Sequence, residues 1–465
     1  MIVRSFLGGI LSFSHPLFTF LDVNVKNTKQ LSNKSLSAPN RLLIVTRFYP
    51  PDFAATGQLI EELAIYLSCC GVNVRVFTGQ PGYAFQSDAA PAQESSNNLL
   101  IRRTRISRIW SNRIRGRVVN GVLFWLRSFI HLVKAAFWCK TLLLTTEPPY
   151  LPLLGYLINR MTGIPYICLL YDLYPDVAVE LNVIKQQHWL VKIWDWLNVQ
   201  TWKHAQQVIV LSSTMKDRVV AKCPEIGDRV TVIHSWANPR WILPVKKQDN
   251  AFAATHNLVD RFTVLYSGNM GRCHDIETIV EAAHLLQEEP IQFVFIGGGP
   301  RKQECQDLVV SLGLTNCLFL PYQEKENLPH SLTACDLALV SLLPGMEGLI
   351  APSKLYGMLA AGRPIAAICE PHSYLRQILE EAGCGQAIVN QDSASLVKFI
   401  RQLAADPLLA RQMGEAGRNY LLANFTLEII GQQYLQVLHS EQNGKFHHLD
   451  LNSHPIHAPG SLHDR

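Results

Sequence analysis

Residues 41–79, RLLIVTRFYPPDFAATGQLIEELAIYLSCCGVNVRVFTG, indicate the fold class most directly. A run rich in β-forming residues ends at Pro50-Pro51, a helical segment follows and stops at Gly71, and a second β-rich run, NVRVFT, comes next. Parallel strands need a crossover connection, which is usually a helix. The stretch therefore predicts a βαβ unit in a parallel sheet.

The same order of strand, loop and helix recurs along the rest of the chain. Further strand patterns are TLLLTT (141–146), IPYICLLYD (164–172), QVIVLS (207–212), RFTVLYSGNMG (261–271), IQFVFIGGGP (291–300), DLALVSLLP (336–344) and PIAAIC (364–369). A chain of 465 residues exceeds what one hydrophobic core usually supports. We therefore predict an α/β protein with two doubly wound, Rossmann-like parallel-sheet domains that face a cleft.

Composition suggests the domain boundaries. Asn238-Pro239, Pro244 and KKQDN mark a connection, which divides the chain into domains at 41–245 and 246–425. Residues 1–21 join one arginine to a short apolar run, which suits either a membrane anchor or a non-native upstream extension of the reading frame. We expect 1–40 and the histidine-rich tail at 442–465 to be disordered, with metal binding by that tail as the lesser alternative.

Bulk composition excludes several classes of protein. A hydrophobic fraction of 48% with 17% charged residues suits a packed enzyme with some membrane affinity and does not suit a disordered chain. The eleven cysteines show no CxxC pair and no Cys/His ligand spacing. They indicate reduced thiols in a cytosolic protein and argue against a zinc site.

Residues 95–146 form a block that contains no acidic residue. Its cations are Arg102, Arg103, Arg105, Arg108, Arg113, Arg115, Arg117, Arg127, Lys134 and Lys140. A block of positive charge usually faces an anionic partner, which here could be nucleic acid or a membrane. Within it, GVLFWLRSFIHLVKAAFW (121–138) places Arg127, His131 and Lys134 on one side of a helix and aromatic residues around the rest, which favours a helix in an anionic lipid interface.

Residues 121–138 also fit two other interpretations. An ordinary core helix with a polar stripe is an equal alternative to the interfacial helix. A transmembrane span fits less well because it would bury three polar or charged side chains. Nucleic acid is not expected as a partner.

Three segments in the second half leave a strand, pass through small residues and enter a helix. They are Gly268–Gly271, Gly297–Gly299 and Pro352-Ser353-Lys354. Backbone N–H groups at a helix N-terminus suit phosphate, and small residues let an anion approach the main chain. None matches GxGxxG with a following acidic residue, and no GxxxxGK[ST] is present, so a dinucleotide dehydrogenase and a P-loop NTPase are disfavoured.

The third segment lies within EGLIAPSKLYGMLAAGRP (347–364), which combines chemistry that a packing helix does not need. Ser353 is predicted to be an N-cap, and Lys354 places a point charge beside the first free N–H groups, so the two can hold a diphosphate. Gly362 with Pro364 ends the helix. Glu347, in the preceding loop, can accept hydrogen bonds from sugar hydroxyls. A surface lysine and a solvated loop acid are the alternatives for Lys354 and Glu347.

Several of these stretches together resemble glycosyltransferase family 4. They are YSGNMGRCHDIETIVEAA (266–283), FIGGGP (295–300) and PSKLYGMLAAGRP (352–364), preceded by RFYPPDFAATG (47–57) and YDLYPD (171–176). The similarity covers roughly residues 41–440 and is greatest to bacterial sugar transferases of exopolysaccharide, colanic-acid and O-antigen assembly. It implies a GT-B fold, a nucleotide-diphosphate sugar held by the second domain, an acceptor held by the first, and transfer with retention without an obligatory metal or other cofactor. A last helix at 426–441 would cross back to the first domain.

The resemblance implies the site residues, both where this sequence matches the motifs of the family and where it departs from them. The family often has two glutamates separated by seven residues; Glu347 fits the first, but the second position falls on Gly357 and the spacing is shifted. The usual Arg and Lys of the loop near 268 appear as Asn269 and His274. The donor-binding set is then Gly268, Asn269, Arg272, His274, Gly298, Tyr322, Ser353, Lys354 and Leu355.

Catalysis is assigned to Asp172, Glu347 and Lys354. Positive groups on the leaving diphosphate stabilise the charge that develops there, and Glu347 would hold a donor-sugar hydroxyl. Asp172, which stands in a Tyr-Asp pair where many members have His-Asp, is the candidate for orienting or deprotonating the acceptor hydroxyl, with a turn or cap acid as the alternative. Asp176 is a weaker acceptor-side candidate, and Gly57 should approach the donor phosphates or the acceptor across the cleft. YDLYPD has no DxD spacing, so no catalytic metal is expected.

The basic block fits an acceptor carried on polyprenyl diphosphate, with the enzyme in the cytoplasm at the inner face of the plasma membrane. Two alternatives remain at this point. One is a sugar-nucleotide epimerase, which has the same fold and a diphosphate site. The other is a non-catalytic, membrane-associated protein that binds a sugar nucleotide, which Gly357 in place of a glutamate would favour.

Overall fold

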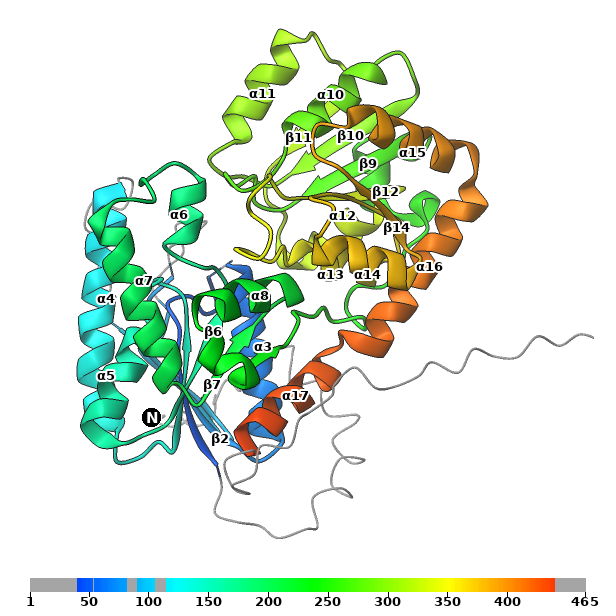
Figure 1. The fold of residues 1–465 in the computed structure, drawn as a ribbon. Coiled ribbons are helices and arrows are strands. Elements are labelled where there is room, and N and C mark those ends of the chain that lie inside the picture. The colour runs from blue at the N-terminus through cyan, green and yellow to red at the C-terminus, as the bar shows by residue number, and fades with distance from the viewer. Residues whose placement is uncertain (1–39, 53, 82–89, 105–113, 440–465) are drawn as a thin grey trace, which may run out of the picture.

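The computed structural model contains two α/β domains, one above the other in Figure 1, joined along one side by long C-terminal helices. It describes residues 40–52, 54–81, 90–104 and 114–439. The predictions for residues 1–39 and for the tail after His439 lie outside this part of the chain, as do those for Arg105, Arg108 and Arg113.

The first domain is built on an eight-stranded sheet with the order β3-β4-β2-β1-β5-β6-β7-β8, in which all neighbours are parallel except β3 and β4. Its inner strands are almost wholly apolar because helices cover both faces. The strands are β1 (Arg41–Val45), β2 (Asn73–Thr78), β3 (Gln93–Ser96), β4 (Leu99–Arg103), β5 (Thr141–Thr145), β6 (Tyr166–Leu170), β7 (Gln207–Val210) and β8 (Val230–Val232).

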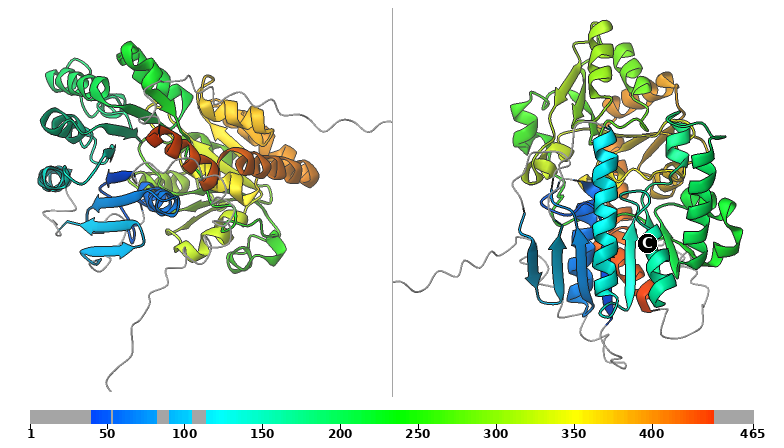
Figure 2. Two further views of the ribbon diagram at one scale, coloured as in Figure 1. Left: turned by 90° about the horizontal axis from the view of Figure 1, so that it is seen from below. Right: turned by 90° about the vertical axis from the view of Figure 1, so that its left-hand side faces the viewer.

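The helices of this domain divide between the two faces of the sheet. α3 (Ala55–Cys69) packs on one face, and the other face carries α4 (Ile114–Ala135), α5 (Leu153–Thr162), α7 (Trp189–His204) and α8 (Ser213–Lys222). α6 (Asp176–Glu180) lies at the upper end of α7, and the 3₁₀ helix η1 (Pro224–Arg229) precedes β8. We call α4, α5 and α7 the outer layer; Figure 2 (right) shows α4 standing at its front.

The second domain has a six-stranded, fully parallel sheet with the order β11-β10-β9-β12-β13-β14. The strands are β9 (Phe262–Ser267), β10 (Ile291–Ile296), β11 (Cys317–Leu320), β12 (Leu337–Ser341), β13 (Ile365–Ile368) and β14 (Gly385–Ile388). Its helices are η2 (Lys247–Asp249), α9 (Ala251–Thr255), α10 (Glu277–Leu285), α11 (Lys302–Ser311), η3 (Lys325–Asn327), α12 (Leu328–Thr333), α13 (Lys354–Ala361), α14 (Tyr374–Ala382) and α15 (Ser393–Ala405). The predicted fold class, two doubly wound parallel-sheet domains, is confirmed.

Strand order reverses once in each sheet, between β1 and β5 and between β9 and β12. Ligands of open α/β sheets bind outside the carboxyl ends of the strands at such switch points. The loops after β1, β5, β9 and β12 are therefore where a site is expected. They carry Gly57, Glu147, Gly268 and Lys354, respectively, or lead directly to them.

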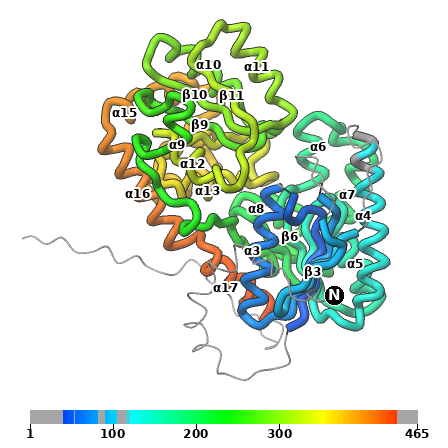
Figure 3. The backbone as a smooth tube through the Cα atoms, turned by 180° about the vertical axis from the view of Figure 1, so that it is seen from behind, coloured from blue at the N-terminus to red at the C-terminus, as the bar shows by residue number. Residues whose placement is uncertain are grey.

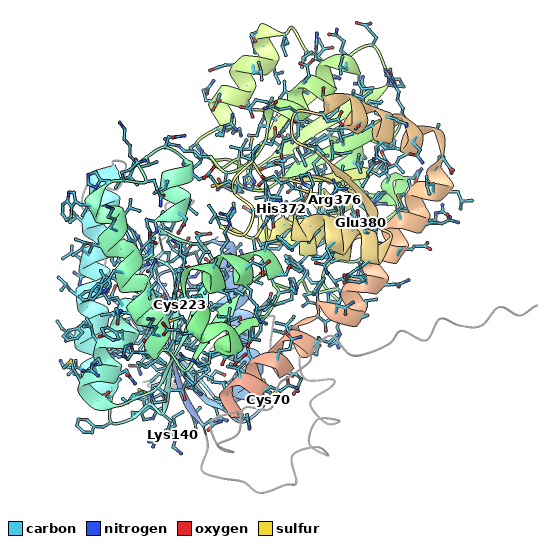
Figure 4. All side chains as sticks on the ribbon, viewed as in Figure 1. Cys70, Lys140, Cys223, His372, Arg376 and Glu380 are labelled. Carbon is cyan, nitrogen blue, oxygen red and sulfur yellow. The ribbon has the colours of Figure 1, made fainter. Side chains whose placement is uncertain are left out.

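Two helices connect the second domain back to the first. α16 (Pro407–Asn424) and α17 (Leu427–His439) run down one side of the molecule, as the tube in Figure 3 shows from behind. α17 packs on α3, where the Tyr66 hydroxyl donates to the Glu428 carbonyl at 3.4 Å and a Cβ on Gly431 would lie 2.4 Å from the Tyr66 ring. Cys70, at the end of α3, lies beside α17 in Figure 4.

The structure corrects the prediction for the basic block. Arg102 and Arg103 lie on β4, and Arg103 is buried, with hydrogen bonds to the Pro50 and Pro91 carbonyls and an ion pair with Glu94. The block is therefore not one cationic face, because part of it is an inner strand that sequence periodicity did not reveal.

The helix that was predicted to lie in a lipid interface is also oriented differently from the prediction, which placed His131 on the polar side. His131 stacks on Phe77 with ring centroids 4.1 Å apart, and burial lowers its pKa to about 4, so it is an inward-facing neutral group. Phe124 is buried as well. The exposed stripe is instead mostly aliphatic: Val119, Val122, Leu126, Ile130, Val133 and Phe137. Across the described residues, no helix has the length and apolar content that crossing a membrane requires.

Candidate active site

Two glycine loops of the second domain interlock at the ends of β9 and β10. Gly297 and Gly299 have φ of 131° and 128°, a region that favours glycine. A Cβ on Gly297 would lie 2.1 Å from the Gly268 carbonyl oxygen, and one on Gly299 would lie 2.4 Å from the Asn269 side chain. The Met270 amide donates to the Gly298 carbonyl at 2.7 Å. Backbone thus packs directly on backbone at the carboxyl ends of β9 and β10.

Lys354 is the first residue of α13, beside these loops. Its Nζ donates to the Tyr266 hydroxyl at 2.6 Å and lies 3.8 Å from the centre of the Tyr266 ring. A Cβ on Gly268 would lie 3.7 Å from Lys354 Cε, so the structure brings these two residues together. Burial lowers the pKa of Lys354 to about 7, and no carboxylate of the described residues forms an ion pair with it. A bound anion would supply the missing counter-charge and raise this pKa.

The other residues predicted around α13 differ in what they can offer. Ser353 lies at the N-cap position and is exposed, but its side chain makes no capping hydrogen bond, so the capping prediction is wrong. Its backbone is already αR there, which is not the extended conformation of a capping serine. Leu355 is fully buried in the core. Tyr322 faces Gly298, where a Cβ would lie 2.9 Å from its ring.

Besides Lys354, two cations that the sequence analysis did not name contact the segments around the glycine loops. His274 is buried, its Nδ1 contacts the Ser341 carbonyl at 2.6 Å, and burial with the nearby Lys354 lowers its pKa to about 3, so it fixes the loop as a neutral ring. Arg272 is exposed. Arg301 donates to the His274 carbonyl at 2.8 Å and Lys302 to the Gly297 carbonyl at 3.0 Å. Their position directly after FIGGGP was the signal that could have identified them.

Glu347 is buried and bridges the two domains. Its Oε1 accepts from the Thr214 hydroxyl of α8 at 2.6 Å and from the Tyr374 amide of α14 at 3.3 Å. Its Oε2 is buried and accepts no hydrogen bond from the residues that the structure describes. An unpartnered buried carboxylate oxygen is costly, so this oxygen has an unused acceptor position that calls for an explanation. Glu347 is therefore not a solvated loop acid.

The loop that contains Glu347 also reaches the acceptor-side strands. Ile350 forms a β-bridge with Asp172, and the Leu173 amide donates to the Leu349 carbonyl at 2.9 Å. Gly348 has φ of 74°, and a Cβ there would lie 2.6 Å from the Thr214 carbonyl oxygen. The donor-side loop thus closes over the first domain and brings the segment of Glu347 against Asp172.

Asp172 follows β6 and is held by its neighbours from β5. The Thr146 hydroxyl accepts from the amides of Tyr171 and Asp172 at 3.0 and 3.3 Å. Burial raises the pKa of Asp172 to about 6. The carboxyl group is therefore mostly ionised at neutral pH but close to its titration range, as a general base should be.

Glu147, directly after β5, was not predicted as a site residue. Its Oε2 accepts from the Thr56 hydroxyl at 3.0 Å. Burial, and then repulsion from Asp172, raise its pKa to about 8, so it is neutral at pH 7. The position of Glu147-Pro148 immediately after a strand at the switch point was the available signal.

Two acceptor-side candidates have structural roles. Asp176 forms an ion pair with Lys222 at 2.6 Å, which Lys222 shares with Asp195. Gly57 is in the first turn of α3, where a Cβ would lie 3.0 Å from the backbone of Phe48 and Tyr49. Helix packing alone thus accounts for glycine at position 57. Gly357, in the position of the second family glutamate, lies within α13 and faces Leu332.

All eleven cysteines are free thiols, as predicted. Among the described residues, no group of three or more His, Cys, Asp or Glu side chains is arranged to hold a metal ion.

Two Rossmann-like domains, with glycine loops and a lysine at the switch point of the second, have the architecture of GT-B glycosyltransferases. Two family models match the chain, the glycosyl transferase 4-like domain over residues 55–236 and glycosyl transferases group 1 over residues 247–420. The chain belongs to the glycosyltransferase family that these two domains define, which confirms the predicted resemblance.

Known relatives and structures agree with this assignment. The glycosyltransferase WbjE of Pseudomonas aeruginosa is 28% identical over 68% of this chain and 78% of its own length. The colanic acid biosynthesis glycosyl transferase WcaI of Escherichia coli is 23% identical over 85% of this chain and 98% of its own. Among solved structures, Anabaena HepE in complex with UDP-glucose matches with a TM-score of 0.65, 13% identity, and coverage of 86% of this chain and 99% of that one.

Proposed function

We propose that this protein is a retaining glycosyltransferase that moves a sugar from a nucleotide-diphosphate sugar to a lipid-linked glycan during surface polysaccharide biosynthesis. The family assignment favours transfer over epimerisation. The observation that carries the proposal is Lys354, a half-buried lysine without a carboxylate partner among the described residues, placed beside two interlocked glycine loops. This is the chemistry that a leaving diphosphate requires.

The donor would bind across the carboxyl ends of β9 and β12. Lys354 and the backbone of Gly268 and Asn269 would contact the diphosphate, and the free oxygen of Glu347 would accept a hydrogen bond from a donor-sugar hydroxyl. The HepE structure contains a UDP-sugar in a protein of the same fold, which supports a nucleotide sugar as donor. Fixed amides and a cation cost no reorganisation when charge develops on the leaving group.

The acceptor hydroxyl would approach from the first domain. Asp172, on the segment that pairs with Ile350, would orient the hydroxyl and take its proton as the new glycosidic bond forms. Glu147 would stay neutral beside it, because two charged carboxylates at this place repel one another. No step of this proposal uses a metal ion or another cofactor.

The lipid-linked acceptor is proposed from the outer layer of the first domain. Phe137 is 97% exposed, and Trp189 and Trp196, one side of α7, are 62% and 61% exposed. α4 and α5 contain no acidic residue, and the one acid of α7, Asp195, is paired with Lys222. Exposed tryptophans, aliphatic side chains and cations such as Lys134 and Lys140 suit an anionic lipid surface at the inner face of the plasma membrane. Figure 4 shows Lys140 at the lower end of this layer.

Turnover of purified protein with a panel of nucleotide sugars, with and without a lipid-linked glycan, tests the proposal. We expect a glycosidic product that keeps the anomeric configuration of the donor sugar, at a rate that a chelator leaves unchanged. An epimerised nucleotide sugar, or donor binding without product, would identify the epimerase or the non-catalytic binding protein instead. An inverted product would contradict retention alone.

Membrane binding is tested separately with anionic vesicles. The double variant Trp189→Ser/Trp196→Ser should reduce co-sedimentation about fivefold, because interfacial binding scales with apolar area. Leu422→Ser, which changes an exposed leucine of α16, is the matched control. If both proteins bind vesicles equally well, the outer layer is not the membrane-binding face.

A further inference from the structure

The first domain contains an apolar pocket that the proposed chemistry does not use. It has a volume of about 330 Å³ and lies among α5, α6 and α7, below the loop that follows β5. Its walls include Pro149, Leu153, Pro175, Ala178, Trp194 and Leu197. This volume is near the lower end of the roughly 300–1,000 Å³ that small-molecule sites have, so the pocket suits a segment of a ligand.

The polar groups in the pocket wall are satisfied by the protein itself. The Asn198 amide donates to the Tyr174 carbonyl at 2.6 Å, and the Thr201 hydroxyl donates to the Leu197 carbonyl at 2.8 Å. The Tyr150 carbonyl accepts from the Trp125 indole at 3.2 Å, which ties this wall to α4. A polar occupant would lose hydrogen bonds to water without replacement, so the pocket selects an apolar one.

The pocket is next to the acceptor-side carboxylates in the sequence and in space. Pro149 follows Glu147 by two residues, and Pro175 follows Asp172 by three. A cation, Arg47, belongs to the same region of the first domain. Burial raises the pKa of both Glu147 and Tyr150, and the charge of Arg47 lowers both.

We propose that this pocket binds the hydrocarbon chain of the lipid-linked acceptor, next to its phosphate-bearing end. The inference rests on the proposed function. The protein places the carboxylates beside an apolar pocket, with the charge of Arg47 acting on the same region, and the acceptor joins a sugar hydroxyl through a diphosphate to a hydrocarbon chain. The pocket also includes Leu190 and Ile193, which are 44% and 47% exposed on the outer layer, so a chain can continue from the pocket into the membrane.

The variant Ala178→Trp tests the occupant by filling the pocket. Transfer is measured to two acceptors with the same glycan, one on a long prenyl diphosphate and one on a short water-soluble chain. We expect the preference for the long-chain acceptor in kcat/KM to fall about tenfold or more, because single methylenes in an apolar pocket have effects of this size. Gln187→Trp adds the same side chain on the exposed loop before α7 and should keep the preference. An unchanged preference in Ala178→Trp would overturn the proposal.

Photo-crosslinking tests the same proposal on the wild-type protein, so it depends neither on enzymatic turnover nor on the correct folding of a variant. Wild-type protein is irradiated with a diazirine-bearing prenyl phosphate and, separately, with a diazirine-bearing diacyl phospholipid in vesicles. We expect the prenyl probe to label residues 149–153 and 190–201, and the phospholipid to label the exposed side chains of α4 and α7. Equal labelling of the pocket by both probes would assign it to bulk lipid, and labelling elsewhere would exclude it. Because the probes need no donor, this result stands even if no sugar transfer is found.

Discussion

The two domains contribute different kinds of groups to the proposed site. On the donor side, loops of Gly268 and Gly297–Gly299 interlock through their backbones, and one cation, Lys354, stands at the start of α13. On the acceptor side, the chemistry is in the side chains of Asp172 and Glu147, which come from the ends of two different strands. The donor side provides a fixed positive site, and the acceptor side provides two carboxyls whose charge depends on pH.

This difference has a chemical reason. Nucleotide-diphosphate sugars all share the diphosphate, so backbone amides and a lysine can recognise it whatever the sugar is. Acceptors vary, and side chains on loops can vary with them on an unchanged scaffold. Changes on the donor side should therefore affect all transfer, whereas changes on the acceptor side should separate donor binding from transfer.

Loss of the donor-side cation should have the largest effect. We expect Lys354→Ala to reduce kcat/KM for transfer by about 10²–10³-fold, the size found when one charge-stabilising donor is removed from an active site. Because the pKa of Lys354 is about 7, UDP binding by the wild type should also weaken as pH rises through this value, and the variant should lack this step. Lys398→Ala, an exposed lysine of α15, is the control. A variant with the wild-type rate would remove Lys354 from the mechanism.

On the acceptor side, Asp172→Asn should reduce kcat by about 10²-fold without changing the affinity for UDP. The amide keeps the shape of the side chain but cannot take a proton, and general-base catalysis contributes about 10²–10⁴-fold. Transfer rates and UDP titrations by calorimetry measure the two effects. Asp176→Asn is the comparison, because its ion pair with Lys222 gives it a structural role, and a loss of less than about threefold is expected. Equal losses in both variants would contradict the assignment of Asp172.

The donor side was also the more predictable from sequence. Glycine loops after strands and Lys354 at a helix start are local patterns, and the structure brings them together. The fold followed from repeated strand and helix patterns for the same reason. The partners of Glu347, Thr214 in the first domain and Tyr374 in the second, are far from it in the chain, so no local pattern could reveal that it is buried.

Misses elsewhere have related physical causes. His274 was assigned to the donor set by its position in a motif, but only the packed structure shows that burial keeps it neutral. β4 was hidden in the basic block because its arginines alternate poorly with apolar residues, and the buried Arg103 donates to carbonyls that lie elsewhere in the chain, at Pro50 and Pro91. Glu147 stands out only because it follows β5, where the strand order of the sheet reverses. The pattern of a single strand does not contain the strand order.

Glu147→Gln should change the pH dependence more than the rate at pH 7. The pKa of Asp172 is about 6, so kcat should rise as that carboxyl ionises, and the pKa of Glu147 is about 8, so kcat should fall when a second negative charge appears beside it. Glutamine imitates the neutral acid and should remove the fall above pH 8. Measurement at saturating donor matters, because bound diphosphate keeps Lys354 protonated. An alkaline fall that persists in the variant would show that Glu147 does not control it.

Loss of the hydrogen bond between Thr214 in the first domain and Glu347 in the second should have the smallest effect. Thr214→Val removes the hydroxyl that donates to Glu347 Oε1 from the first domain and leaves the Tyr374 amide in place. A hydrogen bond to a charged group contributes about 1.5–3 kcal/mol, but a carboxylate that keeps one partner and can gain water loses less, so we expect the KM for the donor to rise about threefold to fivefold. Ser213→Ala, on the exposed neighbouring residue of α8, is the matched control.

Whether Thr214→Val changes the KM for the donor or the Tm identifies the role of the hydrogen bond between Thr214 and Glu347. If Thr214 orders Glu347 for the donor sugar, the variant binds the sugar nucleotide more weakly but binds UDP, which has no sugar, as well as the wild type does. If the contact only holds the domains together, Tm falls while both affinities stay the same. The first result would show that the acceptor-side domain prepares a donor-side residue, so that the two halves of the cleft form one site only when closed; the second would limit Glu347 to domain packing.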